Sequence, residues 1–192
     1  HDFPGGTEEL VKDAAALAIE AVAEKRQLTV RVTVRNVNAG HHLPSGITIR
    51  NMLLMITPIT DNGDTLRYTG NLRVPGYGGI GDPLEGNFAG LPGKGFALIF
   101  GDDKGNTHVM DWQAKRVIAD TRIKAREQDI SEYTFELPSN VGPIDIHTEL
   151  IYRRAFKPLA DIKKWNMKDM VVATDKTTIK LRKRVEASLP SN

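Results

Sequence analysis

Residues 27–36 alternate between apolar and polar side chains with a period of two. Leu28, Val30, Val32 and Val34 take one set of positions, and threonines and arginines take the positions between them. Successive side chains of a β-strand point to opposite faces of the sheet, whereas a helix would scatter these residues around its surface. We therefore expect a strand that buries its valine face against a core and leaves its other face in water.

Further apolar or alternating runs, each bounded by polar turns, predict more short strands. They span 46–60, 65–70, 94–102, 107–112, 115–127, 129–138, 144–156 and 177–185. The turn at 61–64 reads Asp-Asn-Gly-Asp, and the Asn-Gly pair favours a hairpin. Many short strands with few helices predict a mainly β protein, an antiparallel β-sandwich of immunoglobulin-like kind.

The first 25 residues allow two interpretations. Thr7 suits a helix N-cap, and the two glutamates that follow it suit the positive end of a helix dipole. From Leu17 onward the apolar residues alternate, so we expect a short helix up to about Ala15 and then a hairpin. A single helix over 8–25 is the competing interpretation. A second helical or irregular piece is expected at 157–170.

The segment 70–95 predicts one long Gly-rich loop, because it holds nine glycines and three prolines. Apolar side chains are scattered through it, so we expect the loop to be packed by its own residues and not to be a free linker. The predicted organisation is an N-terminal arm with a short helix (1–15), a single sandwich domain (16–185) and a tail (186–192).

Composition excludes several classes of function. The chain has no cysteine, so disulfides, zinc–cysteine sites and covalent haem attachment through Cys-x-x-Cys-His within this chain are ruled out. A formal net charge of +2 gives no basic field for nucleic acid, and no apolar run is long enough to cross a membrane. Because the sequence begins at His1 and not at methionine, we expect a processed product or a piece of a longer protein.

Short motifs follow one another along most of the chain. A His-x-Phe-x-Gly-Gly stretch covers 1–6, and a hairpin then leads to Asn36 and a Gly-His-x-x-Pro-Ser-Gly loop at 40–46. Later elements are Arg50, an Asp-x-Gly turn at 61–63, an Asp-x-Arg-Ile stretch at 120–123 with Glu127 after it, and a Tyr-Arg pair ahead of Trp165. In this order the motifs resemble the haem-free β-sandwich domain at the C-terminal end of many bacterial and archaeal multihaem c-type cytochromes. The residues that carry the family pattern after the first stretch include Gly40, His41, Pro44, Ser45, Gly46, Arg50, Asp120, Arg122, Tyr152 and Arg153.

Two departures from the family pattern are visible. Residues 124–126 read Lys-Ala-Arg where a Pro-Gly is usual before Glu127, and the chain lacks a haem-attachment motif. Ser45 stands where the pattern usually has threonine. The resemblance therefore points to a cytochrome-associated domain and not to a cytochrome by itself.

The resemblance implies a role for His1 as an axial ligand to a haem c held in trans, in a preceding domain or a partner chain. An imidazole on a Gly-rich arm can reach such an iron, and two-imidazole ligation suits electron transfer. His1 is thus the candidate metal ligand. A terminal residue or tag remnant without function is the competing interpretation.

The adjacent His41 and His42 leave three interpretations open. They are a haem or metal ligand, a catalytic pair, or polar braces of a tight turn between Gly40 and Gly46. We favour bracing, with Ser45 and Arg50 as partners of His41, and we expect His42 to be the more exposed of the two.

We expect the other candidate residues to have structural roles. Arg50, Asp120, Arg122, Tyr152 and Arg153 are expected to form internal polar contacts at a loop base or between sheets. His108 and His147 lie in strand-like runs, and Asp102, Asp103 and Asn106 suit a turn better than a calcium loop. Trp112 and Trp165 are expected to anchor the core or an edge.

Two functions are carried forward, the first of them implied by the resemblance, and a subunit of an enzyme whose redox centre lies in a partner chain is a weaker third. The first is a non-enzymatic accessory module of an exported multihaem electron-transfer system, periplasmic or extracellular, that shields or docks a haem of a partner domain or subunit within a homo- or hetero-oligomer. The second is a cofactor-free structural or adhesive sandwich that mediates assembly. The localisation rests on the resemblance alone.

Overall fold

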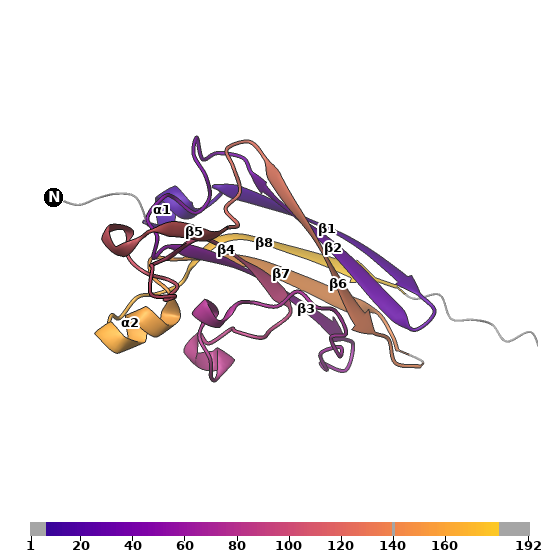
Figure 1. Ribbon diagram of the computed structural model, residues 1–192. Helices are drawn as coiled ribbons and strands as arrows, with labels where there is room; N and C mark the ends of the chain where they lie inside the picture. The colour runs from indigo at the N-terminus through magenta and orange to yellow at the C-terminus, as the bar shows by residue number, and fades with distance from the viewer. Residues whose placement is uncertain (1–6, 140, 181–192) are drawn as a thin grey trace, which may run out of the picture.

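The computed structural model describes residues 7–139 and 141–180 as two antiparallel sheets packed face to face (Figure 1). One sheet has the strand order β1–β2–β6 and the other the order β5–β4–β3–β7–β8. The elements are α1 (Glu8–Val11), β1 (Ala15–Glu24), β2 (Gln27–Asn36), β3 (Asn51–Thr60), η1 (Gly76–Gly78), η2 (Pro83–Glu85), β4 (Gly93–Gly101), η3 (Asp111–Gln113), β5 (Arg116–Asp120), β6 (Gln128–Glu136), β7 (Ile144–Arg153), α2 (Lys157–Lys163) and β8 (Met170–Ile179). The predicted β-sandwich is confirmed.

The first hairpin forms where the change of period predicts it. β1 pairs with β2 from Ala15 opposite Asn36 to Glu24 opposite Gln27, and the helix before it ends at Val11. A single helix over 8–25 is therefore wrong. The valine face of β2 is fully buried, and Asn36 continues that face as a buried polar residue.

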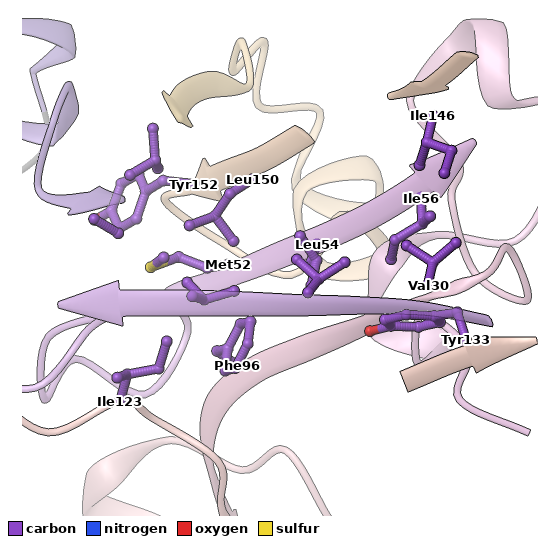
Figure 2. Close-up of a cluster of buried hydrophobic side chains, with 14 of the residues drawn as sticks. Val30, Met52, Leu54, Ile56, Phe96, Ile123, Tyr133, Ile146, Leu150 and Tyr152 are labelled. Atoms are coloured by element: carbon purple, nitrogen blue, oxygen red, sulfur yellow. The ribbon is translucent and has the colours of Figure 1, made fainter. Parts of the chain in front are cut away.

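The main core lies between the two sheets and is closely packed (Figure 2). Met52, Leu54 and Ile56 of β3 meet Val30 of β2 and Tyr133 of β6, all of them 2% exposed or less. Burying each such side chain contributes about 1.5–3 kcal/mol before entropy is counted. This layer holds the two sheets together.

The Gly-rich loop forms a third layer on the outer face of the five-stranded sheet. β3 is buried on both sides, and its outward-facing Leu53 and Met55 pack with Val74 and with Phe88 of the loop. Gly95 lies close beneath the loop, since a Cβ there would sit 2.1 Å from the hydroxyl of Tyr77. Val74 and Phe88 thus pack the loop down, as expected, whereas Ile80 and Leu84 of the same loop are exposed.

Several predicted strands differ from those observed. Residues 46–50 form turns before β3, residues 65–70 make only isolated bridges, and β8 begins at Met170, with the predicted end at 185 outside the described residues. The run at 107–112 is not a strand, because β5 occupies the edge of β4 that this run would need. Within the described ranges, no helix is long and apolar enough to cross a membrane.

Candidate functional site

The histidine loop is tied to the stretch that follows β5. The side-chain Nδ2 of Asn36 donates to the carbonyl oxygens of His41 (2.8 Å) and Ile123 (3.2 Å). Leu43 and Ile123 exchange two backbone hydrogen bonds of 2.8 Å. One buried amide and one two-residue bridge thus join the 40–46 and 120–123 motifs, which are far apart in the sequence.

The two histidines of this loop have different surroundings. The His41 ring is exposed, and its Nδ1 lies 2.8 Å from the carbonyl oxygen of His42, whose own side chain is half-buried. This is the reverse of the expected order of exposure. Ser45 accepts a hydrogen bond from Nη1 of Arg50 (3.0 Å), and neither residue bonds to the His41 ring. The loop is braced by Asn36 and by the Arg50–Ser45 pair instead.

The Asp120 and Arg122 side chains pair directly beside the loop. Nε and Nη2 of Arg122 donate to the two carboxylate oxygens of Asp120 at 2.8 and 2.7 Å. The hydrogen bonds from Arg122 hold the pKa of Asp120 below its ordinary value, and the nearby His42 acts in the same direction. This pair lies at the base of the loop, where internal polar contacts were predicted.

Tyr152 and Arg153, adjacent in β7, point to opposite faces of their sheet. Tyr152 faces the histidine loop, where it lines a cavity beside Arg50. Arg153 faces the Gly-rich loop and bonds to Asp169 and to two loop carbonyls. The Tyr-Arg motif therefore serves two separate regions. Asp169 was not predicted, because no local pattern marks a partner 16 residues away.

A cavity of about 300 Å³ opens between α1, the histidine loop and the ends of β3, β7 and β8. Leu10 and Val11 of α1 form part of its apolar wall. His41, Ser45 and Arg50 form its polar side. The sequence predicted the polar residues but not the contribution of α1, because the packing of a four-residue helix has no periodic signal.

The candidate haem ligands can be compared with this geometry. His1 lies outside the described residues, and among the residues that are described no three His, Asp or Glu side chains cluster as metal ligands do. The His41 ring fits an axial ligand: a proton on Nδ1, donated to the His42 carbonyl, leaves a lone pair on Nε2. This is the arrangement typical of ligating histidines. The half-buried His42 makes no hydrogen bond through its ring within the described ranges.

The remaining candidates lie elsewhere. His147 is an exposed residue of β7, whereas His108 lies in a bend with φ of 60°, beside the rings of Tyr77 and Phe156. Burial against those rings lowers the pKa of His108. Trp112 is 78% exposed and Trp165 is 45% exposed, so neither belongs to the core, the first of the two places expected for them. Asp102 closes its turn by accepting from the backbone of Lys104 and Asn106, as the turn interpretation predicts.

Comparisons with known proteins find a similarity among solved structures. No protein-family model matches the sequence, and no curated protein matches it. Among solved structures, the fold resembles that of a penta-haem cytochrome c552 from Thermochromatium tepidum, with a TM-score of 0.70 and 22% sequence identity. The similarity covers 92% of this chain but only 42% of that cytochrome chain. It shows a shared fold over nearly the whole of this chain.

Proposed function

We propose that this chain is a haem-free β-sandwich module of an exported multihaem c-type cytochrome system and serves electron transfer without catalysing a reaction itself. The observation that carries the proposal is the fold shared over 92% of this chain with part of a penta-haem cytochrome. The order of the sequence motifs points the same way. Since the chain has no cysteine, the haem would be attached elsewhere, in a preceding domain or in a partner subunit.

The N-terminal segment enters the sandwich beside the histidine loop. The backbone N–H groups of Val37 and Asn38 donate to the carbonyl of Ala14, and Nδ2 of Asn38 donates to the carbonyl of Asp13 at 2.8 Å. Figure 1 shows α1 at the same end of the sandwich as β5. Six residues precede Thr7 and can span about 20 Å. A haem iron ligated by His1 would then lie near this end, within the neighbourhood of His41.

This position gives the module a physical role. A protein layer placed over one haem edge excludes water and lowers the local dielectric, and both effects tune a reduction potential. Because c-type haem attachment takes place outside the cytoplasmic membrane in the family that the motifs resemble, we place the module in the periplasm or outside the cell. Its partner would be a multihaem domain or subunit.

The test is an intact mass and a visible absorption spectrum of the natively isolated protein, with His1→Ala, His41→Ala and the control His147→Ala. A low-spin haem spectrum that travels with the chain, changes in one of the first two variants and is unchanged in the control supports the proposal. The variant that changes identifies the ligand. A colourless protein, or a haem spectrum that neither ligand variant alters, contradicts the assignment of these histidines.

A second function, a cofactor-free module that mediates assembly, is favoured by exposed apolar side chains. Ile80 and Leu84 of the Gly-rich loop are 86% and 95% exposed, and Ile162 of α2 is 78% exposed. The loop and α2 lie side by side, because a Cβ on Gly79 would meet the side chain of Lys157. A colourless chain whose oligomers dissociate when Leu84 and Ile162 are changed to serine would favour this function over the first.

A further inference from the structure

The cavity beside the histidine loop combines apolar walls with one-sided charge. Leu10, Val11 and Met52 supply apolar surface, and Lys12, His41 and Arg50 supply groups that carry or can carry positive charge. No aspartate or glutamate lies among the residues that line it. No carboxylate of the cavity lining therefore balances its positive charge.

Arg50 differs from the other inward-facing arginines of the fold. Arg122 and Arg153, whose side chains are 14% and 5% exposed, are each paired with a carboxylate at 2.7 Å. Arg50 is half-buried, and within the described ranges the one hydrogen bond of its side chain goes to the hydroxyl of Ser45. A partly desolvated guanidinium with free N–H groups favours an anionic partner.

Tyr152 provides a second, independent observation. It lines the same cavity and is only 6% exposed, yet its hydroxyl makes no hydrogen bond with any residue that the structure describes. Polar groups of buried residues are normally paired, so this hydroxyl is free to donate to an added partner. An acceptor placed in the cavity would satisfy Tyr152 and Arg50 together.

We propose that this cavity binds a carboxylate carried on an apolar body, with Arg50 and Tyr152 donating to the carboxylate and α1 and Met52 packing against the body. The volume lies at the lower limit for ligand sites, which suits a short amphiphilic acid or one edge of a larger group. The carboxylate belongs either to a free acid or to a haem propionate of an adjoining domain. The propionate source rests on the function proposed above, whereas the site itself does not.

The first arm of the test titrates the whole chain with octanoate by isothermal calorimetry, with 1-octanol as the matched neutral ligand. We expect saturable octanoate binding that exceeds octanol binding. Arg50→Gln should weaken octanoate binding roughly tenfold to a hundredfold and Tyr152→Phe several-fold, because Arg50 pairs its charge with the carboxylate whereas Tyr152 is a neutral donor. Arg67→Gln, an exposed change at the opposite end of the sandwich beside Glu136, should leave binding unchanged. Circular dichroism and unfolding midpoints check that every variant is folded.

Three results would each overturn the proposal. They are no saturable octanoate binding, an octanol affinity equal to that for octanoate, and variants Arg50→Gln and Tyr152→Phe that bind octanoate as tightly as the parent chain. The second arm asks whether haemin or its dimethyl ester displaces octanoate. Displacement by haemin alone assigns the carboxylate to a propionate, and displacement by neither assigns it to a free acid. Equal displacement by the ester means that the carboxylate is not recognised, which overturns the proposal. A colourless chain that binds octanoate would contradict the proposed haem function and would still support this binding site.

Discussion

The guanidinium of Arg153 and the carboxylate of Asp169 pair through two hydrogen bonds of 2.7 Å on the outer face of the five-stranded sheet. The other N–H groups of Arg153 donate to the carbonyl oxygens of Gly78 (2.7 Å) and Gly86 (2.6 Å). The ring of Phe88 lies 4.9 Å from the guanidinium carbon. One nearly buried side chain therefore fastens the Gly-rich loop to the sheet.

Arg153→Gln should be strongly destabilising. It leaves the Asp169 carboxylate and two loop carbonyls without their donor, and breaking a buried ion pair in this way typically costs about 3–5 kcal/mol. Urea unfolding measures the loss, and hydrogen exchange should show it concentrated in 76–90. Arg67→Gln, whose side chain is 80% exposed, is the control and should cost less than about 1 kcal/mol. A similar cost for both variants would contradict the fastening role of Arg153.

Asn36→Ala should loosen the histidine loop. The variant deprives the His41 and Ile123 carbonyls of a shared, fully buried donor, at a cost of about 1–3 kcal/mol. Limited proteolysis within 38–46 should become faster than in the parent chain. The neighbouring Asn38→Ala, which removes one exposed hydrogen bond to Asp13, serves as the control. Unchanged stability and cleavage in Asn36→Ala would mean that the bridge between Leu43 and Ile123 is enough to hold the loop.

Stability should fall as pH rises through the titration of Glu149. Burial, and secondarily the nearby Asp169 carboxylate, raise the pKa of Glu149 above its ordinary value of 4.5. The folded state thus holds its proton more tightly than the unfolded state. The resulting stabilisation is fully present below pH 4.5 and is lost as pH rises through the folded-state pKa.

Glu149→Gln removes this titration. The free energy of unfolding of the variant relative to the parent should therefore increase from acid to neutral pH, as measured by urea unfolding at several pH values. Glu24→Gln, at an exposed position of β1 next to the first turn, is the control for the substitution itself. A flat difference for Glu149→Gln would exclude the raised pKa.

Lys94 and Asp129 should couple the two sheets energetically. Nζ of Lys94 in β4 lies 2.5 Å from Oδ1 of Asp129 in β6, with both side chains about three-quarters buried. Lys94→Met leaves a partly desolvated carboxylate and should cost about 1–3 kcal/mol. Adding Asp129→Leu should recover most of that loss, because an apolar pair avoids the unpaired charge. A double-mutant cycle by chemical unfolding measures the coupling, and strict additivity would argue against it.

The period of the side chains alone predicts much of this fold. The alternation at 27–36, 129–138 and 144–156 identifies β2, β6 and β7, since the geometry of a strand imposes the same period wherever it pairs. The apolar residues in 70–95 likewise predict a packed loop. The sequence motifs by themselves also single out Asn36, Arg50 and Tyr152.

Only the tertiary structure decides which of these residues meet. The side chain of Asn36 bonds to Ile123 across 87 positions of sequence. The side chain of Arg153 pairs with Asp169, whereas that of Arg50 bonds only to Ser45 within the described ranges. The run at 107–112 has strand-like composition, yet β5 takes the edge it would need. Side-chain period is a local property of the backbone. Strand order, partner choice and the cavity beneath α1 depend on how two whole sheets pack, and no short stretch of sequence encodes that.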